Sequence, residues 1–166
     1  HDVERVIFVA HKIRVAFLGE GDLLPAAVIA VLDKNIIPPE NIFLSEKDKK
    51  VHEVVADRGV VFCSDDMNTV VKGEVVVVCA SKKIELSSAL APISGCTGGR
   101  IVISLCPGAD CAYVQERVAR GTTVLAAQPT ESEDGVLMAS LEFSNGFPTY
   151  MRGPCTDIVG TVCELL

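Results

Sequence analysis

The sequence predicts an α/β fold in which helices cover both faces of a doubly wound, mostly parallel sheet. Apolar runs of strand length alternate with amphipathic stretches of helix length, which is the pattern of successive βαβ units. Residues 75–78 are all valine, and a strand without polar alternation is typical of a parallel sheet covered on both faces. Because parallel crossovers are almost always right-handed, such units wind into this one architecture.

Length and composition agree with one folded domain. The chain has 166 residues, of which 49% are hydrophobic and 22% are charged, and this excludes a disordered chain. We expect residues 13–166 to form a single domain that needs neither a metal nor disulfides for stability. Because the chain opens with His1, residues 1–12 are either a remnant of recombinant expression or, at residues 6–10, an additional strand.

The individual elements follow from the apolar runs and the stretches between them. Strands are expected at residues 13–18, 42–44, 60–62, 75–80, 101–105 and 123–127. Helices are expected at residues 23–34, 49–58, 83–90 and 110–120, where apolar side chains recur at three-and-four spacing. Beyond Thr130 the pattern weakens, and it predicts only a strand at 136–141 and, after a Gly- and Pro-containing stretch, a helix at 157–166.

A glycine turn follows the first predicted strand. The turn reads Gly19-Glu20-Gly21-Asp22-Leu23 and leads directly into a predicted helix. In dinucleotide-binding proteins the first glycine permits the tight turn, the second lets a pyrophosphate approach the backbone, and the helix amides donate to it. We therefore expect these residues to bind the pyrophosphate. The alternative is that both glycines only form a tight strand-to-helix turn.

Three features of the turn oppose tight binding. The third position of the glycine fingerprint is Leu24 rather than Gly or Ala. Glu20 and Asp22 place two carboxylates beside the expected phosphate site, where like charge weakens binding. Asp22 also fits a helix N-cap, and capping is an alternative role for it.

The end of the second predicted strand occupies the position that reads the adenosine ribose. Ser45, Glu46 and Lys47 lie there. Glu46 would accept hydrogen bonds from the ribose hydroxyls of NAD, whereas Lys47, Lys49 or Lys50 would hold the 2′-phosphate of NADP. These residues do not decide between NAD and NADP. They also fit a solvent-exposed helix start that binds no ligand.

The fourth predicted strand ends at the edge of the sheet where ligands of open α/β sheets bind. Cys79, Ala80 and Ser81 are expected to line that crevice. Lys82 and Lys83 follow, and each either meets a phosphate or faces water.

Composition also excludes several classes of function. A net charge of −7 and a pI near 4.9 argue against a nucleic-acid partner, and the apolar runs are too short to span a membrane. The 7 cysteines include no Cys-x-x-Cys pair, which indicates reduced thiols in the cytoplasm. Cys106 is expected to be structural rather than reactive, and the separation of His11 from His52 argues against a metal site.

Several blocks of the sequence resemble the N-terminal NAD(P)-binding domain of pyrroline-5-carboxylate reductase. The blocks are residues 13–24, 37–42 (IPPENI), 45–47, 63–66 (CSDD), 73–78 and 100–104 with Gly108. The resemblance implies a Rossmann-like domain and hydride transfer from NADPH or NADH to a small imine in proline synthesis. No catalytic acid or base is identified in this chain.

The sequence departs from that family at the expected site. Asp22-Leu23 stands where the family usually has Asn-Met, Ser81-Lys82 where it has Lys-Pro, and residues 128–131 only partly match its Pro-Asn-Thr-Pro run. The helical C-terminal domain, which in the family forms the dimer and much of the substrate site, has no counterpart in this sequence. We therefore expect a cofactor domain without turnover of its own, which takes an imine substrate only with a helical domain and forms a homodimer. The alternative is a non-catalytic binding or interaction module.

Overall fold

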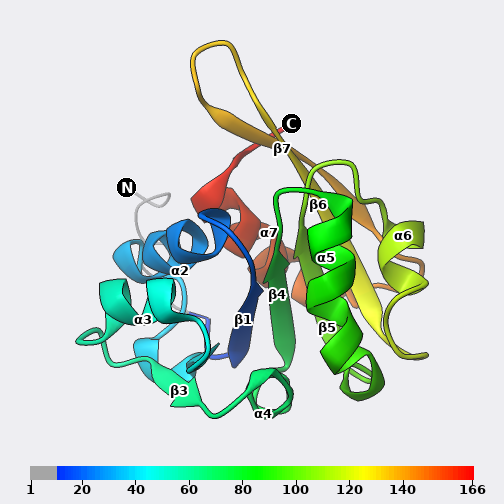
Figure 1. Cartoon of the computed structure of the whole chain (residues 1–166). Helices are drawn as coiled ribbons and strands as arrows, with labels where there is room; N and C mark the ends of the chain where they lie inside the picture. Colours follow the sequence, from blue (N-terminus) through cyan, green and yellow to red (C-terminus); the bar gives the residue numbers. More distant parts are fainter. Residues whose placement is uncertain (1–10) are drawn as a thin grey trace.

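The strands form one eight-stranded sheet in the order β3-β2-β1-β4-β5-β6-β7-β8. Residues 11–166 are described in this computed structural model (Figure 1), so the strand predicted at 6–10 lies outside the described residues. The strands are β1 (Val15–Gly19), β2 (Ile42–Ser45), β3 (Val61–Cys63), β4 (Val75–Cys79), β5 (Ile101–Leu105), β6 (Thr123–Glu131), β7 (Leu137–Phe143) and β8 (Glu164–Leu165). Neighbours from β3 to β6 pair in parallel, while β7 runs antiparallel to β6. The predicted doubly wound, mostly parallel sheet is confirmed.

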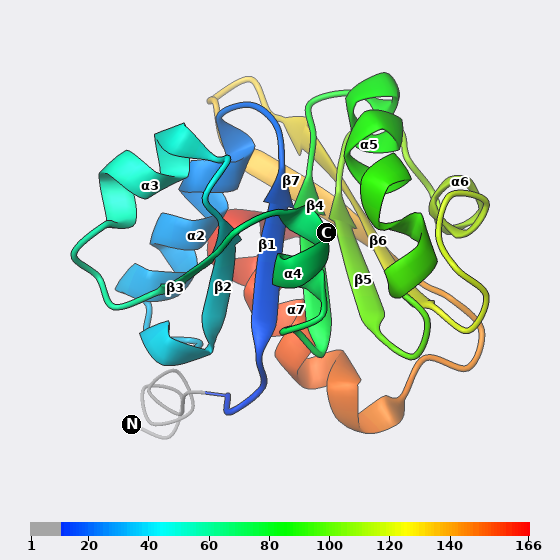
Figure 2. The same cartoon turned by 60° about the horizontal axis from the view of Figure 1, so that its bottom comes forward.

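Helices cover both faces of this sheet. They are α2 (Leu23–Asp33), α3 (Lys49–Val55), α4 (Asp66–Val70), α5 (Lys83–Leu90), α6 (Cys111–Gln115) and α7 (Thr149–Val162), with the 3-10 helices η1 (Pro39–Asn41) and η2 (Ala91–Cys96). One core lies under α2, α3 and α7, and a second lies under α4, α5 and α6. Figure 2 shows α4, α5 and α6 in front of the sheet and α7 behind it.

The valine run of β4 supplies both cores. Val75 and Val77 belong to the core under α2 and α7, and Val76 and Val78 belong to the opposite core. All four side chains are fully buried. Alternate residues of a strand point to opposite faces, so a strand in the middle of a covered sheet needs apolar side chains at every position.

The C-terminal helix differs from the prediction. Helix α7 begins at Thr149 and ends at Val162, and the predicted helical residues Glu164 and Leu165 form β8 instead. The prediction missed the first turns of α7 because they contain Gly153 and Pro154. Proline inside a helix lacks an amide donor and clashes with the preceding turn. Burial of Met151, Cys155, Ile158 and Val159 along one face of the helix offsets that cost.

Other helix boundaries also differ. Helices α3 and α6 end at Val55 and Gln115, earlier than predicted, while α4 was not predicted. Helix α4 is only five residues long, so it carries little periodic signal, but Asp65 caps it by accepting a hydrogen bond from the Asn68 amide at 2.8 Å.

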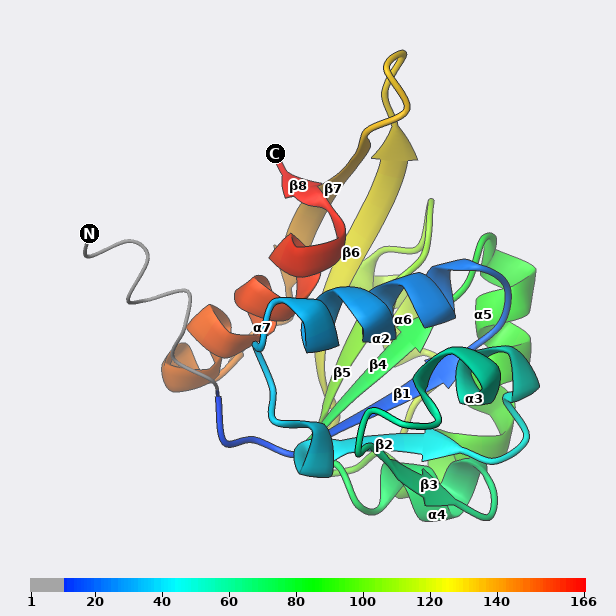
Figure 3. The same ribbon diagram turned by 90° about the vertical axis from the view of Figure 1, so that its left-hand side faces the viewer.

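A hairpin extends one corner of the sheet. Pairing of β5 with β6 ends at Leu105 and Ala127, whereas β6 continues to pair with β7 as far as Glu131 and Leu137. The β6–β7 hairpin therefore projects beyond the other strands (Figure 3). None of the helices within residues 11–166 combines the length and the hydrophobicity needed to cross a lipid bilayer.

Candidate functional site

The candidate site lies where β1 and β4 end side by side in the middle of the sheet. Gly19 of β1 pairs with Cys79 of β4. The chain leaves β1 for α2 on one face and leaves β4 for α5 on the other face. The crevice between these two connections is the topological switch point, which is where open α/β sheets bind their ligands.

Gly19 is required by the contact between these strand ends. Its φ is +135°, and a Cβ at this position would lie 2.0 Å from the backbone oxygen of Cys79. The next amide, that of Glu20, donates a hydrogen bond to the same oxygen at 3.0 Å. Since the Glu20 amide is already paired, the donors available to a ligand begin at Gly21.

Free backbone amides follow at the start of α2. Gly21 has a φ of +81°, and no hydrogen bond within residues 11–166 engages the amides of Gly21, Asp22 and Leu23. The first amide of this helix that is paired belongs to Ala26, which donates to the Asp22 carbonyl. Unpaired amides at the positive end of a helix dipole suit a phosphate group.

The side chains of Asp22 and Leu24 leave this turn open. Leu24 is only 1% exposed and packs in the core beneath α2. Asp22 occupies the N-cap position without a side-chain capping bond, so the capping alternative is wrong. Its carboxylate is 97% exposed and lies 3.3 Å from the Lys50 ammonium group, which partly balances its charge.

A cleft of about 300 Å³ adjoins the turn, and we call it the Gly19 cleft. Its lining residues are Leu18, Gly19, Glu20, Lys47, Asp48, Asp66, Ser88, Ala89 and Pro92. They come from the ends of β1 and β2, from α4 and from the α5–η2 segment. The cleft therefore lies between the glycine turn and the segment at the end of β2 that is expected to read the ribose.

Of the residues predicted to contact the ribose, only Lys47 lines the Gly19 cleft. Ser45 is fully buried, and its hydroxyl accepts a hydrogen bond from the Lys47 amide at 3.3 Å. Glu46 is exposed, and its amide donates to the Cys63 carbonyl at 2.8 Å. Ser45 therefore shapes the turn that presents Lys47, and Glu46 stands outside the cleft.

Sequence analysis missed two of the carboxylates in the cleft. Asp48 and Asp66 line it together with Glu20. Burial raises the pKa of Asp48 to about 6, with further contributions from the negative charges of Asp66 and Glu20. Within residues 11–166 no group of three or more His, Cys, Asp or Glu side chains is arranged to hold a metal ion. Three carboxylates therefore share the cleft with one cation, Lys47.

The end of β4 supports the crevice mainly through packing. Cys79 and Ala80 are fully buried, and burial raises the pKa of the Cys79 thiol far above its usual range. Ser81 is exposed, but its amide and its hydroxyl both donate to the Glu85 carboxylate, the amide at 3.1 Å. These bonds lower the pKa of Glu85. Ser81 precedes the N-cap residue Lys82, so its spacing to Glu85 is one residue longer than that of a capping box and gave no sequence signal.

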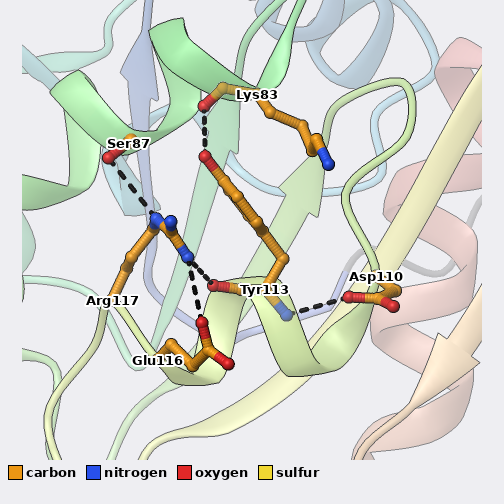
Figure 4. A network of polar contacts seen from close by, with 6 residues as sticks. All are labelled: Lys83, Ser87, Asp110, Tyr113, Glu116 and Arg117. Carbon is orange, nitrogen blue, oxygen red and sulfur yellow. Dashed lines mark hydrogen bonds and ion pairs between the residues drawn. The ribbon is translucent and has the colours of Figure 1, made fainter.

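Lys83 is directed to a tyrosine rather than to a phosphate site. Its ammonium nitrogen lies 5.1 Å from the ring centroid of Tyr113, and the Tyr113 hydroxyl donates to the Lys83 carbonyl at 2.8 Å. The Arg117 guanidinium lies 3.6 Å from the same ring centroid and donates to the Tyr113 carbonyl. Figure 4 shows the polar contacts of this network, which joins α6 to α5. Lys82 is exposed and, like Lys83, does not line the Gly19 cleft.

The cysteines are all free thiols. Cys106, at the end of β5, is buried, and burial raises the pKa of its thiol to about 11. A thiol with a raised pKa is a poor nucleophile, as expected for a structural cysteine.

Comparison with known proteins finds similarity in structure only. No protein-family model matches the sequence, and no curated protein sequence matches it. The structure is similar to that of pyrroline carboxylate reductase from Plasmodium falciparum with NADP bound, with a TM-score of 0.75 and 19% identity over 95% of this chain. It is also similar to a pyrroline-5-carboxylate reductase from Coxiella burnetii, with a TM-score of 0.74 and 16% identity over 94% of this chain.

A second group of similar structures consists of reductive aminases and imine reductases. The reductive aminase from Aspergillus terreus in complex with NADPH and ethyl levulinate has a TM-score of 0.66 and 11% identity over 94% of this chain. This chain spans 58% of the length of both pyrroline carboxylate reductases and 54% of the aminase. The similarities establish the Rossmann-like fold.

The site itself fits a dinucleotide in its backbone and only partly in its charges. The free amides of Gly21, Asp22 and Leu23 suit a diphosphate, and Lys47 suits an additional phosphate. The carboxylates of Asp48 and Asp66 oppose the additional phosphate, because they line the same cleft as Lys47, whereas the three free amides do not line it.

Proposed function

We propose that this chain is the NAD(P)-binding domain of an oxidoreductase similar to pyrroline-5-carboxylate reductase. The observation that carries the proposal is the row of unpaired amides at Gly21, Asp22 and Leu23, located at the topological switch point of the sheet. When bound, the reduced cofactor supplies a hydride. The residues of this chain bind and orient it through main-chain donors and nearby charges.

The cofactor that the cleft favours is NADP(H). Lys47 lines the cleft and provides a cation for the 2′-phosphate, whereas Glu46, the residue that would accept from the ribose of NAD, does not line it. The similar structures from P. falciparum and A. terreus were solved with NADP and NADPH. Both observations support NADP(H) over NAD(H).

The substrate class we propose is a small imine, reduced at its carbon–nitrogen double bond as in proline synthesis. The domain formed by residues 13–166 supplies the cofactor half of such a site. A helical domain, from the same polypeptide or from another chain, would complete the substrate site and form a homodimer. The resemblance and the 58% of the reductase length that this chain spans support this part of the proposal.

A second candidate function is a binding or interaction module that has lost tight cofactor binding. The observation that favours it is the negative charge around the phosphate site, where Glu20, Asp48 and Asp66 share one cleft. Like charges lower the affinity for a diphosphate by an amount that depends on burial and on salt.

Calorimetric titration with NADPH and NADH distinguishes these candidates. We expect NADPH to bind more tightly than NADH, and Lys47→Ala to weaken NADPH binding by about tenfold with little change for NADH. Lys72→Ala is the matched control, because Lys72 is exposed, does not line the cleft and was not a candidate for the 2′-phosphate. If neither NADPH nor NADH binds, the proposal is contradicted and the second candidate is favoured.

A further inference from the structure

The side-chain carboxylate of Asp48 does not contribute a hydrogen bond or an ion pair to the described part of the fold. It occupies the N-cap position of α3, yet its side chain makes no capping hydrogen bond. Its backbone is paired, since its amide donates to the Ser45 carbonyl at 3.0 Å and its carbonyl accepts from the His52 amide. No hydrogen bond or ion pair found in residues 11–166 involves its carboxylate, which lines the Gly19 cleft.

The charged groups around Asp48 come from several elements. Glu20 faces it from the glycine turn and Asp66 faces it from α4, and both are carboxylates. Lys47, the preceding residue, is the cation that lines the same cleft. Lys50, on the first turn of α3, is paired with Asp22 at 3.3 Å.

The remaining neighbours carry no charge. The wall formed by α5 and η2 contributes Ser88, Ala89 and Pro92. Cys79 is also near enough to interact electrostatically with Asp48, and its buried thiol has a raised pKa and stays neutral. Carboxylates therefore outnumber the available cation, and a phosphate that enters the cleft adds further negative charge.

We propose that Asp48 contacts the bound nucleotide as a neutral carboxylic acid, so that nucleotide binding is accompanied by the uptake of one proton at this side chain. The proposal rests on the proposed function and assigns a proton-linked role to a residue of that site. A protonated carboxyl group gains an O–H donor, which can bond to a phosphate or ribose oxygen. The proton comes from solvent and returns to it when the nucleotide leaves.

The direction of the pH dependence follows from the electrostatics. Burial and the neighbouring carboxylates already raise the pKa of Asp48 to about 6 in the free protein. A nucleotide phosphate beside Lys47 in the same cleft disfavours the ionised form further, so the pKa rises again in the complex. Between the two pKa values the complex holds more protons than the free protein, and affinity falls as the pH rises.

Calorimetric titration with NADP⁺ between about pH 5.5 and pH 8.5 tests the proposal. For the wild type we expect affinity to fall by up to about tenfold per pH unit above about pH 6.5, with proton uptake measured in buffers of different ionisation enthalpy. Asp48→Asn keeps the shape of the side chain and removes its titration. The 2′-phosphate of the ligand titrates in the same range, so the quantity compared is the difference between variant and wild type.

The expected result is that Asp48→Asn binds more tightly than the wild type at pH 8 and has a shallower pH dependence. Asp57→Asn, an exposed aspartate outside the cleft, is the control and should match the wild type. A carbon-13 titration of the Asp48 carboxyl group should show its midpoint moving upward when NADP⁺ is added.

Three results would overturn the inference. Equal pH dependence of the wild type and Asp48→Asn, or an Asp48 midpoint that does not move on binding, removes the proton link and leaves the proposed function intact. Failure of the wild type to bind any nucleotide across the whole pH range removes the proposed function, and the inference with it.

Discussion

The backbone of Gly19 lies directly against the carbonyl group of Cys79, so that a Cβ at position 19 would stand 2.0 Å from the carbonyl oxygen. This contact holds the ends of β1 and β4 together at the edge of the sheet where the candidate site opens. A side chain at this position would push the strand ends apart.

Gly19→Ala should therefore destabilise the protein by more than about 3 kcal/mol, because backbone overlap is added to an unfavourable φ of +135°. Urea unfolding measures the loss. Gly108→Ala is the control, since Gly108 also has a positive φ, +76°, but no heavy atom lies within 4 Å of its added Cβ. It should cost about 1 kcal/mol from backbone strain alone. Equal losses would show that the Cys79 contact is unimportant.

Asp22→Asn should strengthen nucleotide binding by about fivefold, because it removes a negative charge beside the unpaired amides and keeps the shape of the side chain. The variant also releases Lys50 from its ion pair, so that this cation becomes available to the diphosphate. Calorimetry with NADPH measures the change.

Asp33→Asn is the matched control for Asp22→Asn. It also removes an aspartate charge from an ion pair of α2, the 2.9 Å pair with Arg58, but at the opposite end of the helix. This control should leave the affinity unchanged. Weaker binding by Asp22→Asn would contradict an anion site at the turn.

Asp48→Asn should raise the stability of the free protein near pH 7.5 by about 1 to 2 kcal/mol, after allowance for solvent screening. The pKa of Asp48 is raised from 3.8 to about 6 in the fold, so the native state holds more protons than the unfolded state between these values. Stability therefore falls as the pH rises from about 4 to 6 and stays lower above that range.

Urea unfolding of the wild type and the variant at about pH 4 and pH 7.5 checks this sign. The two proteins should be similar at the lower pH and differ at the higher one. A variant that is less stable near neutral pH would mean that the ionised carboxylate is stabilised by the fold.

The sheet could be predicted from the sequence because its signal is local. Each strand from β1 to β5 is a short apolar run, and Gly19 and Gly21 mark the turn at which the first strand ends. The cleft was harder to predict, because Asp48 and Asp66 belong to separate elements that only the folded sheet brings together. Asp66 also lies on a five-residue helix that is too short to produce a periodic pattern.

The C-terminal helix was predicted to begin too late. Pro154 suppressed the expectation of a helix from Thr149, although the apolar residues at helical spacing were already visible there. Tertiary burial outweighed local propensity in α7, and no single-sequence rule gives the size of that burial.

The isolated chain should have no imine-reductase activity of its own. The isolated chain, supplied with NADPH and pyrroline-5-carboxylate, should oxidise the cofactor no faster than a reaction without protein. The chain spans 58% of the length of the similar reductases, and the acid of the Gly19 cleft with a raised pKa, Asp48, is assigned to the nucleotide and not to an imine. Binding should be measurable in the same sample, because the donors for the diphosphate lie within this domain.

Loss of reduced-nicotinamide absorbance measures turnover, and a complete pyrroline-5-carboxylate reductase in the same assay is the positive control. Sustained, protein-dependent oxidation of NADPH would show that residues 1–166 already contain a complete imine site. In that case the helical domain would be unnecessary for catalysis in this protein. Binding without turnover would instead place this chain as the cofactor half of a larger reductase.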